Sequence, residues 1–186
     1  MRRAIKDIVL PVAVAIVLAF VIQAAVAKPY EIPTASMEPT IQSDDRIIAN
    51  RVIYRVRDIE RGDIIVFDPP QSAIRSCPGD GSGDIPVVKR VIGLPGDKIT
   101  VMNGMTFVNG EPDVVADSAR PDYSIPASGP DSVPVVPEDS LFVLGDNRPD
   151  SCDSSRWDPD PFVPQDSVIG QAEMIYWPLN NIAFVD

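Results

Sequence analysis

The chain has 186 residues with 20 Pro, 2 Cys and no His, and its 27 acidic and 16 basic side chains give a net charge of −11. The length fits one domain with a short appendage, and a proline content about twice the usual share of about 5% argues against a helical bundle. Without histidine, and with only two cysteines, the chain lacks the commonest general base and the usual ligands of a structural zinc site. The negative charge argues against nucleic acid as a partner, because phosphates would be repelled.

A long apolar run near the N-terminus predicts a transmembrane helix. It covers residues 8–27 and contains a single conventional polar residue. Twenty helical residues extend about 30 Å, the thickness of the hydrocarbon core of a bilayer. A basic cluster at 2–6 precedes the run, so we expect a single-pass anchor over 1–27 with a cytoplasmic N-terminus and an extracytoplasmic domain over 28–186. The alternative is a cleaved signal peptide, because Ala-Val-Ala at 25–27 resembles a cleavage site, but the run exceeds the usual apolar segment of about 7–15 residues.

After the anchor the apolar runs become short and are separated by Gly, Pro, Asn and Asp. No long stretch there has a period of 3.6, so we predict a mostly β fold, an antiparallel and barrel-like β-domain. The pairs Asn103-Gly104 and Asn109-Gly110 predict tight turns, since both residue types tolerate positive φ. The expected strands cover residues 46–54, 63–67, 85–92, 98–102, 106–108, 141–144 and 168–176.

Two segments do not fit this β pattern. Residues 68–84 and 111–138 are rich in Pro, Gly, Ser and Asp. Loops of this length in a compact domain are usually functional or disordered. We therefore treat both segments as loop insertions.

A serine and a lysine form the candidate catalytic pair. Ser36 lies between Pro33 and Pro39, which stiffen an otherwise mobile loop. Lys89 lies in a run of Val and Ile on an expected strand, and burial there would lower the pKa of its amine below the ordinary value of about 10.4. An uncharged amine accepts a proton, so Lys89 is the candidate base for Ser36 in a chain without histidine. The alternatives are a serine that completes a turn and a lysine whose amine reaches water.

Four motifs follow the apolar run in order. They read PTASMEPT at 33–40, RGDIIVF at 61–67, VKRVIGLPGD at 88–97 and GDNRPDSCDS at 145–154. Together they resemble signal peptidase I, the membrane-bound Ser-Lys serine endopeptidase that removes signal peptides from exported proteins. The resemblance implies the antiparallel β catalytic domain of that family, with no cofactor and no metal.

The resemblance also implies a role for each matched residue. Ser36 matches the nucleophile and Lys89 the general base, while Thr34 matches a hydroxyl that forms the oxyanion hole with the Ser36 N–H. Ser151 matches a serine that hydrogen-bonds the amine of the base, and Gly145 lets the backbone pass close to the site. The supporting polar cluster is matched by Asp146, Asn147, Arg148 and Asp153.

The last motif departs from the family pattern, which usually ends in Asp-Ser-Arg. Here it reads Asp-Ser-Ser from Asp153, and the arginine is displaced by one position. Asp153 therefore has three candidate ion-pair partners, which are Arg156, Arg148 and Arg90. The catalytic pair does not depend on this choice.

Two cysteines lie in the expected exported domain, where oxidation is permitted. Cys77 falls in the first insertion and Cys152 in the last motif. We hypothesise a disulfide between them that joins the insertion to the neighbourhood of the site. Two free thiols are equally compatible with the sequence.

The implied substrates are preprotein signal peptides, cut after a small residue. In the family, small side chains at substrate positions −1 and −3 enter shallow apolar pockets. The candidate lining residues are Ile32, Met37, Val88 and Val91. For each of these four, ordinary core packing is the alternative.

The expected setting is a membrane, either the bacterial plasma membrane or a thylakoid-type membrane. The implied partners are therefore the lipid bilayer and, by proximity, the export translocon. Nucleic acid is not an expected partner. One alternative is a maturase of the same Ser-Lys class that is dedicated to one substrate. A second is a noncatalytic, membrane-anchored binding module in which the motifs only shape a sheet.

Overall fold

A computed structural model describes residues 9–15, 26–78, 85–102, 105–113 and 135–185. Residues 9–15 are helical, and most of the apolar run expected to cross a membrane lies outside the described residues. Within the described ranges, no helix is both long and apolar enough to span a bilayer. The predicted Asn103-Gly104 turn also lies outside them.

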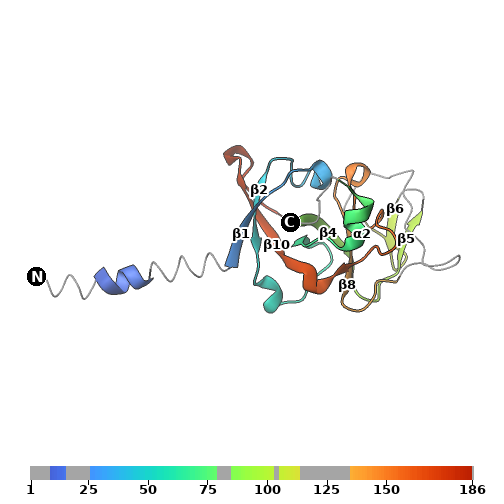
Figure 1. Cartoon of the computed structure of the whole chain (residues 1–186), viewed down its shortest axis with the longest axis horizontal. Helices are drawn as coiled ribbons and strands as arrows, with labels where there is room; N and C mark the ends of the chain where they lie inside the picture. The colour runs from blue at the N-terminus through green and yellow to red at the C-terminus, as the bar shows by residue number, and fades with distance from the viewer. Residues whose placement is uncertain (1–8, 16–25, 79–84, 103–104, 114–134, 186) are drawn as a thin grey trace, which may run out of the picture.

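One antiparallel sheet contains most of the described strand residues (Figure 1). Its strands follow the order β1 (Ala27–Glu31), β2 (Arg46–Asn50), β10 (Val168–Trp177), β3 (Ile64–Phe67), β4 (Val87–Gly93), β8 (Ser140–Leu144) and β9 (Val163–Pro164), and β11 (Ala183–Phe184) pairs with β10. The predicted mostly β, antiparallel class is therefore correct. Among the described strands β1 and β9 are the two ends of this order and do not pair, so the sheet is open rather than a closed barrel.

A second sheet of three strands is formed by a β-meander. It contains β5 (Ile99–Met102), β6 (Met105–Val108) and β7 (Glu111–Pro112). Asn109 and Gly110 join β6 to β7 with φ angles of 54° and 88°, which confirms the predicted turn. Both residues adopt the left-handed conformation that Asn and Gly tolerate best.

Each expected strand overlaps an observed strand, and four observed strands extend one residue beyond the expected bounds. The strand expected over residues 46–54 is shorter than predicted. The observed strand β2 ends at Asn50, and the 3-10 turn η2 (Ile53–Arg55) follows it. The insertion at 68–84 contains a helix, α2 (Gln71–Ser76), which begins directly after Pro70. The remaining 3-10 turns are η1 (Ala35–Met37), η3 (Arg148–Asp150), η4 (Gln165–Ser167) and η5 (Leu179–Asn181).

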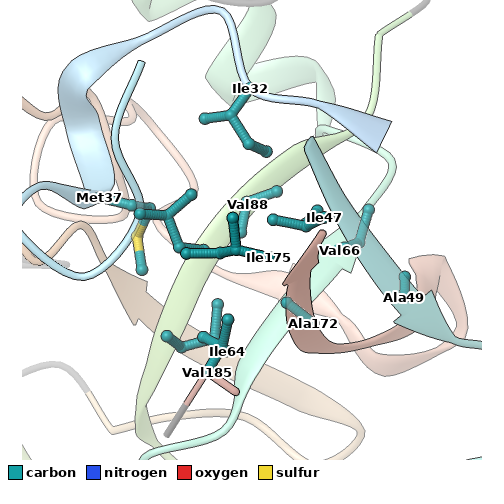
Figure 2. Close-up of a cluster of buried hydrophobic side chains, with 11 residues drawn as sticks. Ile32, Met37, Ile47, Ala49, Ile64, Val66, Val88, Ala172, Ile175 and Val185 are labelled. Atoms are coloured by element: carbon teal, nitrogen blue, oxygen red, sulfur yellow. The ribbon is translucent and has the colours of Figure 1, made fainter. Parts of the chain in front are cut away.

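The alternation of side chains on β3 and β4 divides the core into two clusters. Ile64 and Val66 point into the cluster of Figure 2, whereas Ile65 and Phe67 point into a second cluster that contains Trp157. A third cluster lies between the two sheets and contains Ile92, Ile99, Val108, Val136, Phe142 and Leu144. Because both faces of β3 and β4 are covered, a polar side chain on β4 is buried whichever face it occupies.

Candidate active site

The turn η1 holds Ser36 in a fixed place. Met37, the next residue, is fully buried and packs into the cluster beside Val88 and Ile175 (Figure 2). The turn closes with a hydrogen bond from Glu38 N to Ala35 O of 3.1 Å. The apolar neighbour therefore anchors the turn, and the Ser36 residue is only 3% exposed.

Lys89 reaches this turn from the middle of β4. It lies opposite Ile65 on β3 and is 2% exposed. Its Nζ is 2.7 Å from Ser36 Oγ, a buried hydrogen bond between residues 53 positions apart. The structure thus brings together the serine and the lysine that the sequence selected.

The Thr34 hydroxyl lies on the same side of the turn. Its Oγ1 is 3.2 Å from Ser36 Oγ, with either oxygen able to donate. Thr34 has an extended backbone and directly precedes η1. When a nucleophile attacks a carbonyl, negative charge develops on the carbonyl oxygen. A hydroxyl within hydrogen-bond distance of the nucleophile also lies close to that oxygen.

The segment after β8 packs tightly against the serine turn. Asn147 donates two hydrogen bonds to it, from its backbone N to Ser36 O at 3.1 Å and from Nδ2 to Ala35 O at 3.0 Å. A Cβ atom on Gly145 would lie 2.4 Å from Ser36 O, so a side chain there would displace the turn. The close approach predicted for Gly145 is therefore present.

Asp146 links three chain segments through its carboxylate. Arg90, the residue after Lys89, donates to both oxygens, from Nε to Oδ1 at 2.8 Å and from Nη2 to Oδ2 at 2.7 Å. Thr40 Oγ1 donates to Oδ2 at 2.5 Å. Thr40 lies in the first motif, but its role could not be predicted, because a partner 106 positions away leaves no local signal.

Two of the three arginines proposed for Asp153 pair with other carboxylates. Arg90 pairs with Asp146, and Arg148 pairs with Asp113 at 2.5 Å. Asp153 accepts hydrogen bonds from Gly145 N and from the backbone and hydroxyl of Ser155, and in the described chain no ion pair joins it to an arginine. Local N–H and O–H donors stabilise this buried carboxylate. It therefore has hydrogen-bond partners even though the arginine of the motif is displaced by one position.

Arg156, the displaced arginine of the last motif, meets Asp153 only through the main chain. Its side chain is exposed. Its backbone N donates to Asp153 O at 2.8 Å. This contact closes a turn and leaves the Asp153 carboxylate to its other donors.

Ser151 lies beside the site without the bond expected of it. The residue is fully buried, and its Oγ would be 2.3 Å from a Cβ on Gly145, so it packs against the segment that contacts Ser36. Among the described residues its Oγ has no hydrogen-bond partner. The predicted hydrogen bond to the Lys89 amine is therefore not formed in this structure.

The four candidate pocket residues do not form one group. Ile32, Met37 and Val88 belong to the cluster of Figure 2, next to the serine turn. Val91 belongs to the second cluster, on the other face of β4, because residues 88 and 91 of a strand point to opposite faces. All four are between 0% and 7% exposed, which is the packing of an ordinary core.

A disulfide joins Cys77 and Cys152, whose Cα atoms are 6.2 Å apart. Cys77 directly follows α2, and Cys152 directly follows Ser151. The bond connects the first insertion, at the residue after α2, to the segment that packs on the serine turn. In the described part of the chain, no group of three or more His, Cys, Asp or Glu side chains is arranged to hold a metal ion.

Comparison with known proteins identifies the family of this chain. The family model "Signal peptidase, peptidase S26" matches residues 5–177. The chain belongs to this family. The match covers the helical residues 9–15, the serine turn, β4 and the segment after β8.

Named relatives are found in cyanobacteria and plants. The chain is 40% identical to "Probable signal peptidase I-2" of Synechocystis sp., over 92% of this chain and 72% of that protein. It is 38% identical to "Signal peptidase I" of Leptolyngbya laminosa, over 92% of this chain and 79% of that protein. "Thylakoidal processing peptidase 1, chloroplastic" of Arabidopsis thaliana is 33% identical, over 91% of this chain and 47% of that protein.

A solved signal peptidase I from Enterococcus faecalis is also similar. It is 30% identical, with a TM-score of 0.45, over 62% of this chain and 97% of that chain.

Proposed function

We propose that this member of the signal peptidase family is a serine endopeptidase that removes signal peptides from exported preproteins. The observation that carries the proposal is the buried contact of 2.7 Å between Lys89 Nζ and Ser36 Oγ. A buried serine beside a buried amine, in a chain without histidine, is the arrangement expected of a nucleophile with a lysine base. The relatives named signal peptidase I give the substrate class.

The reaction begins with Lys89 in its uncharged form, which burial favours over the ammonium. The amine takes the proton of the Ser36 hydroxyl as Oγ attacks the carbonyl of a small residue of the preprotein. The Thr34 hydroxyl and the Ser36 N–H donate to the oxyanion of the tetrahedral intermediate. The Lys89 ammonium then protonates the leaving amine, and the mature protein departs.

The second half of the reaction repeats these roles with water. Lys89 is again uncharged after the leaving amine has taken its proton, so it can accept a proton from water. The hydroxide that results attacks the ester carbonyl of Ser36, and the Ser36 oxygen leaves with the proton held by Lys89. Signal peptide and free enzyme result, and no cofactor takes part in this scheme.

The short distance along the chain between the proposed anchor and Ser36 supports a site close to the membrane. In the proposed topology residues 1–27 form the anchor, with a cytoplasmic N-terminus, and Ala27 is also the first residue of β1. Ser36 lies nine positions beyond Ala27, so even a fully extended link keeps the nucleophile within about 30 Å of the bilayer surface. A signal peptide held in the bilayer, or delivered by the export translocon, presents its cleavage site in this zone.

The full-length protein in detergent or proteoliposomes tests the proposal with several unrelated preproteins. We expect cleavage at each signal peptide junction, with S36A and K89A each reducing the rate at least about 100-fold. K98A is the matched control, because Lys98 is exposed. Cleavage of one preprotein alone would indicate a dedicated maturase. Undiminished cleavage by S36A would refute the proposal, and failure to cut any preprotein would favour a noncatalytic module.

A further inference from the structure

The Ser36 N–H is fixed by the peptide bond that it shares with the Ala35 carbonyl. A trans peptide is planar, so its N–H and C=O point in opposite directions. Whatever holds Ala35 O therefore also sets the direction of the Ser36 N–H. Ala35 O accepts one hydrogen bond from Glu38 N within the turn, and a second from Asn147 Nδ2 at 3.0 Å.

Asn147 links this peptide to a different segment of the protein. Its backbone N also donates to Ser36 O at 3.1 Å, so main chain and side chain of one residue hold two successive carbonyls of the serine turn. The Glu38 bond lies inside the turn and moves with it. The Asn147 bonds come from a different segment and fix the turn relative to the sheet.

The next residue, Arg148, makes further contacts that hold the segment around Asn147. Its Nε donates to Gly145 O at 3.2 Å, and its Nη2 pairs with Asp113 Oδ2 at 2.5 Å. Both charged side chains are 5% exposed. A guanidinium shielded from water depends on its carboxylate partner, and the planar fork allows it to hold that partner and Gly145 O together.

Asp113 itself is held by the small sheet. It directly follows β7, and its backbone N donates to Thr106 O at 2.8 Å. Thr106 Oγ1 in turn accepts a bond from Arg148 Nη1 at 3.4 Å. The ion pair therefore ties the small sheet to the segment that contacts the serine turn.

We propose that Asn147 is a positioning residue that directs the Ser36 N–H into the oxyanion hole, and that the buried Asp113–Arg148 pair holds Asn147 in place for it. Asp113 lies in no recognised motif. This inference rests on the proposed peptidase function, since it concerns the same oxyanion. It predicts that both residues affect the transition state rather than the binding of substrate.

The first test uses N147D in the full-length protein with a preprotein substrate. Aspartate has the same shape but cannot donate to Ala35 O, so kcat should fall about 10- to 100-fold with KM little changed, approaching the loss of one oxyanion donor. A peptide aldehyde with a small C-terminal residue, which forms a tetrahedral adduct with Ser36, should lose affinity by the same factor. Affinity for an uncleavable peptide of the same sequence should stay constant. N180D is the control, because Asn180 is exposed.

The second test concerns Asp113. D113N should lower kcat and the affinity for the aldehyde as N147D does. D113E can still pair with Arg148, so it should recover most of kcat and of the aldehyde affinity. The control D166N, at an exposed position, should change neither quantity. The double variant D113N/N147D should lose no more than N147D alone, because the two residues act along one path. Should D113N not fold, R148K keeps the charge but loses the planar fork and should give the same losses.

Three results would overturn the inference. These are an unchanged kcat in N147D, an equal loss of affinity for the aldehyde and the uncleavable peptide, or fully multiplicative effects in the double variant. They are distinguishable from failure of the proposed function. If S36A abolishes cleavage while N147D matches the wild type, the function stands and this inference is wrong.

Discussion

Thr40 and Asp146 form a hydrogen bond of 2.5 Å that joins the loop after the serine turn to the last motif. The same carboxylate is held by two bonds from Arg90, the neighbour of Lys89 on β4. The nucleophile loop and the strand of the lysine therefore share one buried carboxylate as a common support. Removing it would leave the Arg90 charge buried without this partner, an effect of about 3–5 kcal/mol in comparable buried pairs.

Replacing Thr34 by valine tests its place in the oxyanion hole. Valine keeps the shape of threonine but cannot donate a hydrogen bond, so kcat should fall about 100-fold, the usual loss for one oxyanion donor. T34S should retain most of the rate. T100V, on β5 in the small sheet, serves as the control. A kcat for T34V within a factor of two or three of the wild type would exclude Thr34 from this role.

Gly145→Ala tests the close packing against the serine turn. The new Cβ would lie 2.4 Å from Ser36 O and 2.3 Å from Ser151 Oγ, so the turn must move. We expect at least about a tenfold loss of kcat/KM and a loss of about 1–3 kcal/mol in the free energy of unfolding.

The matched control for this substitution is Gly110→Ala. Gly110 has φ +88° and open space around it, so alanine there should cost about 1–2 kcal/mol of stability through backbone strain alone. Its activity should equal that of the wild type. Full activity of G145A in the same assay would show that the serine turn tolerates displacement.

The disulfide should be present in protein isolated from an oxidising compartment. Alkylation of the unfolded chain without reductant should leave Cys77 and Cys152 unmodified, whereas reduction first should give two modified thiols. Since 75 positions separate the cysteines, C77S should lower the free energy of unfolding by about 2–4 kcal/mol, measured by thermal denaturation. Two alkylated thiols without reductant would contradict the bond.

The pH dependence of cleavage follows from the role given to Lys89. The base must be uncharged when the reaction begins, so kcat/KM should be low in acid and rise with pH as the amine loses its proton. Because burial disfavours the ammonium, this rise should occur at lower pH than for lysine in water. The residual activity of K89A should not show this rise with pH. A wild-type profile that is flat, or that falls over the same range, would be incompatible with a lysine base.

Much of the fold could be predicted because it depends on local pattern. The strands that carry the core are short Val and Ile runs with turn residues at their ends. By contrast β1 contains Pro29 and mostly exposed side chains, and it is defined by pairing with β2 rather than by hydrophobicity. β7, β9 and β11 have two residues each, too few to show a period.

The catalytic pair was predictable in identity but not in geometry. The absence of histidine and the flanking motifs indicated Ser36 and Lys89, yet only the fold brings them to 2.7 Å. The partners of the supporting residues could not be predicted, since Asp113 and Arg148 are 35 positions apart and no local pattern links them. The bond expected from Ser151 to the amine was wrong for this structure because Ser151 packs against Gly145 instead.

Acylation by a serine-reactive β-lactam tests most directly whether Ser36 is a nucleophile activated by Lys89. Mass spectrometry of the full-length protein should show one bound probe on the peptide that contains Ser36, none on S36A, and a rate of labelling at least about 100-fold lower on K89A. Labelling of S36A to the same extent, or of K89A at the wild-type rate, would contradict the account.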